Sequence, residues 1–132
     1  MAESGKITGL AHIGIKVKDI DASIRFYTDI LGFELTHKQQ SGTSVLAFLN
    51  IGTCLIELIQ SAVYEERTPG QVDHIAVEVK GIEALTASLR ARGVRFLSDD
   101  IALCPNLLDG VKNIFFVGPD GERFEFFEHY NR

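Results

Sequence analysis

Hydrophobic and polar residues alternate in two stretches of the chain that resemble each other. Residues 10–22 (LAHIGIKVKDIDA) align with residues 72–84 (VDHIAVEVKGIEA), which places His12 on His74. In both stretches isoleucine or valine recurs at every second position, as in a half-buried strand. Self-similarity of this kind predicts two copies of one supersecondary unit.

A helix is predicted after each of these strands. In the first copy apolar residues recur at positions i, i+3 and i+7, which are Ile24, Tyr27 and Leu31. Asp21 is the expected N-cap, and Gly32 ends the helix. The second copy repeats this spacing with Ile82, Leu85 and Leu89, and ends at Gly93.

Three further strand-like runs follow the helix in each copy. They are Phe33–His37, Ser44–Leu49 and Leu55–Gln60 in the first copy, and Val94–Leu97, Asn113–Val117 and Phe124–Glu128 in the second. Each half therefore reads β-α-β-β-β. The prediction is a single α+β domain of two modules, each with a curved mixed sheet, which together enclose a metal-binding cup. The module boundaries are 9–61 and 72–129, with a linker at 62–71 and an irregular segment at Asp99–Lys112.

Two carboxylates stand in strands that are otherwise apolar. Glu57 lies in the run LIELI and Glu125 in the run FEFF. A buried carboxylate without a partner costs several kcal/mol, so each glutamate needs a partner nearby. The duplicated His12 and His74 supply one, and two imidazoles with two carboxylates suit a divalent ion such as Zn, Ni, Co, Mn or Fe(II). The set of four is the candidate metal site.

The simpler interpretation is that such a histidine is hydrogen-bonded in the core and such a glutamate faces water at a sheet edge. For the other candidates we expect no chemistry. His37 and His129 are expected to be solvated, and Cys54 and Cys104 are expected to be reduced thiols without a basic neighbourhood that would make them nucleophiles.

Charge and composition exclude several functions. The chain has 132 residues, of which 13 are basic and 18 acidic, with a net charge of −5 and no basic stripe for a phosphate backbone. We therefore expect no nucleic-acid partner. No apolar stretch approaches ~18 residues, so no membrane span is expected. The polar N-terminus lacks the apolar core of a signal peptide, which favours a cytoplasmic location.

Several phrases of the sequence resemble one family. They are FYTDILGF at 26–33, IEL at 56–58, DHIA at 73–76 and PDGERFEF at 119–126, together with a histidine in the first strand of each half. This pattern is similar to the vicinal oxygen chelate superfamily, which groups glyoxalases, bleomycin-resistance proteins and dioxygenases. The resemblance covers nearly the whole chain.

Within that superfamily, the order His–Glu–His–Glu most resembles glyoxalase I, or lactoylglutathione lyase. The resemblance implies that His12, Glu57, His74 and Glu125 are the ligands of one divalent ion. It also implies a homodimer in which each site combines the first pair of one subunit with the second pair of the other. The implied substrate is a small hydroxycarbonyl, such as a thiol adduct of a 2-oxoaldehyde. The implied reaction is proton transfer through an enediolate, with Glu125 as the base and Glu57 as the second carboxylate.

Departures from the glyoxalase pattern leave the substrate open. Lys16 and Ser61 are the candidate substrate-binding residues, but glutathione-using relatives typically have arginine and asparagine there, and Gly70 stands where some have arginine. An alternative is a methylmalonyl-CoA epimerase-like enzyme, although the segment 36–45 lacks the acidic residue which that resemblance requires. Another is a metal-free, bleomycin-resistance-type binding protein without catalytic activity.

Overall fold

Four strands of the first half form one mixed sheet. The computed structural model describes residues 5, 6, 8, 10–66 and 70–131. The strands are β1 (His12–Lys16), β2 (Glu34–Ser41), β3 (Ser44–Asn50) and β4 (Leu55–Gln60). Their order in the sheet is β1-β4-β3-β2, with β1 parallel to β4 and the other neighbours antiparallel.

The second half repeats this arrangement in a separate sheet. Its strands are β5 (Ile75–Glu78), β6 (Arg95–Phe96), β7 (Ala102–Cys104), β8 (Val111–Val117) and β9 (Arg123–His129). The order is β5-β9-β8-β6, and β5 is parallel to β9. The predicted α+β class and the two mixed sheets are confirmed. The prediction of an irregular segment at Asp99–Lys112 is wrong in part, because β7 lies within it and pairs with β8.

Helix α1 (Ile20–Arg25) begins two residues earlier than the sequence predicted. Asp19, not Asp21, is its N-cap, and the Asp19 carboxylate accepts a hydrogen bond from the Ala22 backbone at 3.1 Å. Asp21 already lies in the first helical turn and pairs with Lys38 at 2.7 Å. That contact lowers the pKa of Asp21 through the hydrogen bond and the charge of the lysine. The helix continues as a π-helical turn, η1 (Phe26–Ile30).

Helix α2 (Ile82–Ala91) takes its N-terminal acceptor from another element. Its N-cap position is Gly81, which has a left-handed backbone (φ 72°) and no side chain to accept a hydrogen bond. Glu128 of β9 accepts instead from the backbone nitrogens of Gly81 at 2.6 Å and Ile82 at 3.3 Å. Two of the amides at the start of the helix are thereby satisfied by a strand that is distant in sequence.

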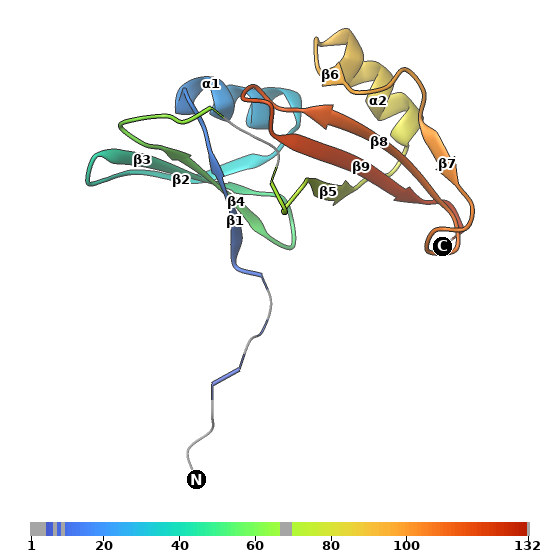
Figure 1. The fold of residues 1–132 in the computed structure, drawn as a ribbon, viewed down its shortest axis with the longest axis horizontal. Coiled ribbons are helices and arrows are strands. Elements are labelled where there is room, and N and C mark those ends of the chain that lie inside the picture. The colour runs from blue at the N-terminus through green and yellow to red at the C-terminus, as the bar shows by residue number, and fades with distance from the viewer. Residues whose placement is uncertain (1–4, 7, 9, 67–69, 132) are drawn as a thin grey trace.

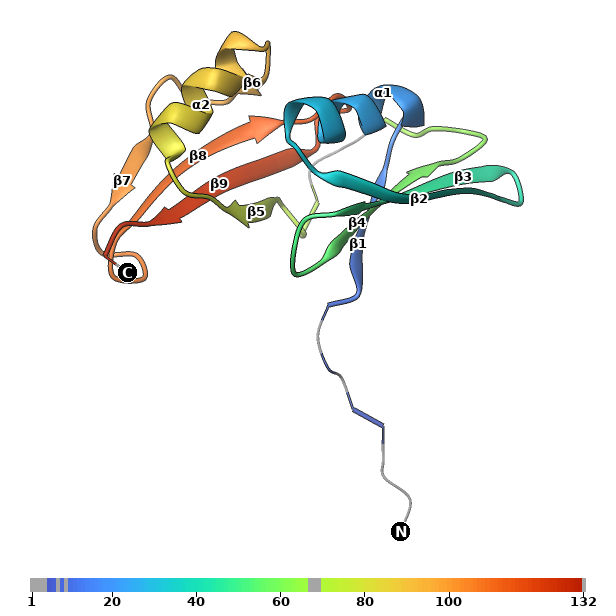
Figure 2. The same cartoon turned by 180° about the vertical axis from the view of Figure 1, so that it is seen from behind.

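Both helices lie on the same side of the two sheets (Figures 1 and 2). The apolar residues of alternate strand positions face these helices and form one core that spans both halves. Its fully buried members include Val17, Tyr27, Leu49, Ile56, Leu58, Ile82, Ile114, Phe116 and Phe124. The intervening strand positions lie on the opposite face, which we call the open face because neither helix covers it.

Hydrogen bonds join the halves on the helix side. The hydroxyl of Tyr27 donates to Glu122 at 2.6 Å, and both residues are buried. The Asp120 backbone nitrogen donates to the other Glu122 oxygen at 2.8 Å. Glu122 packs so closely on Gly118 that a Cβ there would lie 2.4 Å from its carboxyl carbon, so only glycine fits. Arg92 also reaches across and donates to the Asp29 carbonyl at 2.9 Å.

We expect Tyr27→Phe to destabilise the protein by about 1.5–3 kcal/mol, because it removes a hydrogen bond to a buried carboxylate without changing the shape of the ring. Urea unfolding of the variant and the wild type measures the difference. Tyr130→Phe, at a partly exposed ring, is the matched control and should change the free energy of unfolding by less than about 0.5 kcal/mol. Equal effects of the two substitutions would contradict the assigned role of Tyr27.

Candidate functional site

The same strand register places a histidine beside a glutamate in each half. In the first sheet Gly14 of β1 lies opposite Glu57 of β4, and in the second sheet Ala76 of β5 lies opposite Glu125 of β9. Each histidine precedes that small residue by two positions, so it occupies the same face as its glutamate. The small side chain directly opposite each glutamate leaves room for the imidazole ring.

The first pair is formed by His12 and Glu57. The distance from His12 Nε2 to Glu57 Oε1 is 3.3 Å, and the side chain of Glu57 is 15% exposed against 43% for His12. The rings of His12 and of Phe48 in β3 meet edge to face, with their centroids 5.7 Å apart. This pair therefore lies at the surface of the open face, with one aromatic neighbour that orients the imidazole.

The second pair is formed by His74 and Glu125 and is more deeply buried. The distance from His74 Nε2 to Glu125 Oε1 is 3.1 Å, and the side chain of Glu125 is 7% exposed. Phe115 of β8 takes the place that Phe48 has in the first pair, with ring centroids 4.9 Å apart. The other Glu125 oxygen accepts a hydrogen bond of 2.6 Å from the side-chain amide of Asn113.

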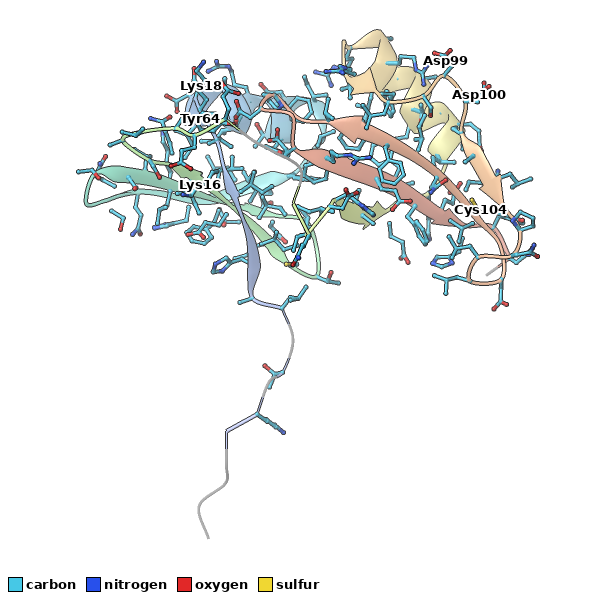
Figure 3. All side chains as sticks on the ribbon, viewed as in Figure 1. Lys16, Lys18, Tyr64, Asp99, Asp100 and Cys104 are labelled. Atoms are coloured by element: carbon cyan, nitrogen blue, oxygen red, sulfur yellow. The ribbon has the colours of Figure 1, made fainter. Side chains whose placement is uncertain are left out.

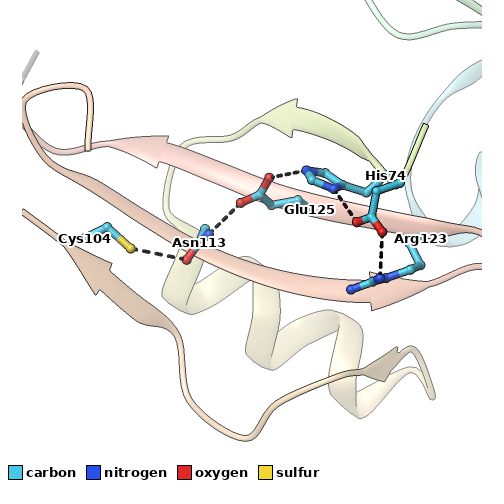
Figure 4. A network of polar contacts seen from close by, with 6 residues as sticks. His74, Cys104, Asn113, Arg123 and Glu125 are labelled. Carbon is cyan, nitrogen blue, oxygen red and sulfur yellow. Dashed lines mark hydrogen bonds and ion pairs between the residues drawn. The ribbon is translucent and has the colours of Figure 1, made fainter. Parts of the chain in front are cut away.

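A chain of polar contacts continues from His74 (Figure 4). Its Nδ1 lies 2.9 Å from the carboxylate of Asp73, which in turn accepts from Arg123 at 3.1 Å. The hydrogen bond to His74, with a further contribution from the charge of Arg123, lowers the pKa of Asp73. On the opposite side of Glu125, the thiol of Cys104 contacts the amide oxygen of Asn113 at 3.9 Å.

These contacts test whether the residues suit a metal ion. Both ring nitrogens of His74 face carboxylate oxygens, but a neutral imidazole has one N–H and can donate to one of them. The other nitrogen then turns its lone pair toward carboxylate lone pairs, and a cation between the two groups removes this conflict. Imidazole nitrogen and carboxylate oxygen are also donors that divalent transition metals accept. The residues fit the ion.

Within one chain the two pairs do not form a single cluster. Among the residues described by the structure, no group of three or more histidine, cysteine, aspartate or glutamate side chains is arranged to hold a metal ion. Each pair supplies one nitrogen and one oxygen on its own sheet. A small cavity of about 210 Å³ lies where residues 13–15 of β1 approach residues 72–75, and it includes His74 but neither glutamate of the candidate set.

The remaining predicted residues have different environments. His37 is exposed, as predicted, and contacts Gln39 at 2.6 Å. The prediction that His129 is solvated is wrong. Its side chain is only 12% exposed, and its Nε2 lies 3.5 Å from Glu78. His129 lies on the open face of β9, two positions after Phe127, and its ring contacts that of Phe127. Both cysteines are free thiols.

The candidate substrate-binding residues belong to the first half. Lys16 is the last residue of β1 in the first sheet and is exposed. Figure 3 shows it well apart from Cys104, which lies at the far end of the second sheet. Ser61 directly follows β4 and is half-buried. The role of both residues in binding stays a prediction.

Sequence reasoning missed three residues of the site: Asp73, Asn113 and Arg123. The sequence offered a signal for each of two of them. Asp73 is adjacent to His74, and Arg123 precedes Glu125 by two positions and therefore shares its face of the strand. Asn113 had no such signal, because its place beside Glu125 depends on the pairing of β8 with β9.

Comparison with known proteins identifies the family. Residues 9–126 match the family model of the Glyoxalase/Bleomycin resistance protein/Dioxygenase superfamily. The chain belongs to this superfamily. It is 37% identical to the uncharacterized protein YwbC of Bacillus subtilis, over 89% of this chain and 94% of that protein. It is 32% identical to a probable lactoylglutathione lyase of Synechocystis, over 88% and 92% of the two chains.

Two further likenesses within the superfamily bear on function. The structure of a trypanothione-dependent glyoxalase I from Leishmania major has a TM-score of 0.78, with 26% identity over 95% of this chain and 89% of that chain. The mitochondrial methylmalonyl-CoA epimerase of mouse is 27% identical over 72% of this chain, which spans 59% of the epimerase. In the described part of the chain, no helix has the length and apolar character needed to cross a membrane.

Proposed function

We propose that the protein is a metal-dependent isomerase or lyase of the glyoxalase I type that works as a cytoplasmic homodimer. Its proposed metal ligands are His12, Glu57, His74 and Glu125. The observation that supports this most directly is the repetition of one His–Glu pair, in one register, on the open faces of both sheets. A metal-free binding protein has no need to place a carboxylate in an apolar strand at both of these positions.

The proposed reaction moves a proton between neighbouring carbons of a small hydroxycarbonyl, such as the adduct of a thiol with a 2-oxoaldehyde. A divalent ion bound at this site would act as a Lewis acid for negative charge on adjacent substrate oxygens. Glu125 is the proposed base, which takes the proton from the carbon beside the carbonyl and returns it to the next carbon. Glu57 is the proposed second carboxylate.

The proposed dimer brings the two pairs together. One subunit would contribute His12 and Glu57, and its partner would contribute the second pair. The separation of the pairs within one chain supports this, since each alone offers two donors while zinc in catalytic sites typically takes three protein ligands. Lys16 and Ser61 are the proposed substrate contacts, and a lysine at the first position offers a point charge in place of the bidentate fork of an arginine.

The second candidate is an epimerase acting on an acyl thioester, favoured by the likeness to the mouse enzyme. Strand β2 contains one carboxylate, Glu34, at its first residue, on the strand farthest from β1 in the sheet order. That position argues against it as the second acid of an epimerase site. Assays with methylglyoxal and several thiols, and with a chiral acyl thioester, separate the two activities.

We expect Zn, Ni, Co or Mn ions to raise the melting temperature of the purified protein by roughly 5–15 °C at a 100-fold excess over Kd, because the ions bind the folded state alone. Differential scanning calorimetry with and without a chelator measures the shift. The double variant His12→Ala, His74→Ala is the control and should not respond. A wild-type protein that gains no stability from any of these ions would favour a metal-free binding module.

We expect Glu125→Gln to lower kcat by at least about 100-fold, because glutamine keeps the shape of the side chain but cannot accept the proton. Steady-state kinetics with the active thiol adduct measures the loss, and the circular dichroism spectrum should stay that of the wild type. His37→Gln, at an exposed site outside the set, is the control and should keep full activity. Unchanged turnover in Glu125→Gln would remove this residue from the role of base.

Mixing two inactive variants tests whether the site is shared between subunits. In a heterodimer of His12→Ala and His74→Ala chains, one of the two shared sites contains all four ligands. An equimolar mixture that exchanges subunits should therefore regain about a quarter of wild-type activity, since half of the dimers carry one intact site. Refolding the variants together and separately provides the comparison. If activity does not return although heterodimers form, the site is built within one chain.

A further inference from the structure

The two His–Glu pairs share their aromatic neighbour but differ in the residues that surround them. Phe48 and Phe115 occupy matched positions, since Phe48 lies opposite Glu57 and Phe115 lies opposite Glu125 in the strand registers. Both rings meet the neighbouring imidazole edge to face, at interplanar angles of 85° and 86°. The duplication is therefore retained for the pair and for the ring beside it.

The polar contacts of the second pair have apolar residues at the matched positions of the first. Asp73 directly precedes His74, whereas Ala11 precedes His12. Arg123 lies two residues before Glu125, whereas Leu55 lies two residues before Glu57. Asn113 lies two residues before Phe115, whereas Leu46 lies two residues before Phe48. Each polar residue around the second pair therefore has an apolar counterpart at the same strand position around the first pair.

The contacts of Asn113 and Asp73 restrict how the second pair can move. The amide of Asn113 holds one oxygen of Glu125 at 2.6 Å, which leaves Oε1 directed toward His74. Asp73 holds Nδ1 of His74 at 2.9 Å, which leaves Nε2 directed toward Glu125. Arg123 anchors Asp73 at 3.1 Å, and its guanidinium lies over the ring of Phe115 at 5.5 Å. His74 Nε2 and Glu125 Oε1, which lie 3.1 Å apart, are thus held facing each other.

We propose that Asp73, Asn113 and Arg123 are positioning residues that preform the His74–Glu125 half of the metal site, whereas the His12–Glu57 half has apolar residues at the three matched positions. The inference rests on the proposed function, since it assigns these residues a role toward the same ion. Outer residues that hydrogen-bond to metal ligands typically contribute 10–100-fold to metal affinity. The asymmetry predicts that this contribution comes from one half of the duplicated site.

The test replaces each outer residue by its counterpart in the first half. Asp73→Ala and Asn113→Leu should each raise the Kd for Co or Zn about 10–100-fold in competition with a chromophoric chelator. Each should also change the visible absorption spectrum of the bound Co, which reports ligand geometry. Arg123→Leu, one contact further out, should have a smaller effect. Leu46→Ala is the matched control in the first half and should leave the Kd within about threefold of the wild type.

A double variant separates positioning from general stability. Asn113→Leu should weaken metal binding in the wild-type background but add little in Glu125→Gln, since the two residues act through one hydrogen bond. Additive losses in this cycle, or an unchanged Kd in both Asp73→Ala and Asn113→Leu while Glu125→Gln binds weakly, would overturn the inference and leave the proposed function intact.

A measurement on the metal-free protein tests the hydrogen bond between Asn113 and Glu125 independently of metal binding. The side-chain amide resonance of Asn113 should be shifted downfield in the wild type and should return toward the free value in Glu125→Ala, because the amide donates to that carboxylate. If the chemical shift of this amide is the same in Glu125→Ala as in the wild type, the inference is overturned. A wild type that shows the shift but binds none of the ions overturns the proposed function, and with it the role of these residues toward a metal.

Discussion

The parallel pairing of the first and last strands in each half determines what the open face can do. It sets His12 diagonally beside Glu57 and His74 diagonally beside Glu125, with glycine or alanine opposite the glutamate. A shift of β1 or β5 by one residue relative to its partner strand would send the histidine to the helix side, away from its glutamate. The core prevents such a shift, because residues such as Ile56, Leu58 and Phe124 are fully buried on the opposite face of the same strands.

Burial makes the two carboxylates unequal. Glu57 lies at the surface of its sheet, whereas Glu125 is nearly enclosed, and polar neighbours must replace the hydrogen bonds that water would otherwise donate to it. The structure meets this need with an amide on one side and an imidazole on the other. A residue that is held by two partners loses freedom of movement, which is a cost in folding but an advantage where a ligand or a base must keep one direction.

The sequence predicted the repeated β-α-β-β-β order and the four candidate ligands because these depend on local periodicity and on polar residues in apolar strands. It did not predict what depends on pairing between strands. Asn113 meets Glu125 through the register of β8 with β9, and β7 forms because Cys104 pairs with Val111. The cap of α1 was misplaced from Asp19 to Asp21, since both residues are acceptable caps by type and the geometry of the preceding strand decides between them.

The contacts between the halves bear on how the proposed site is completed. Tyr27 and Glu122 form a buried hydrogen bond on the helix side, and the Lys18 backbone donates to Asp120 at 3.0 Å. Because one apolar core continues through both sheets, the halves cannot turn their open faces toward each other without separating these groups from their partners. A chain that is held in this way keeps its two pairs apart at a fixed spacing. In the proposed dimer, a second copy with its first sheet beside the second sheet of this one would add the other nitrogen and oxygen without any change in the fold.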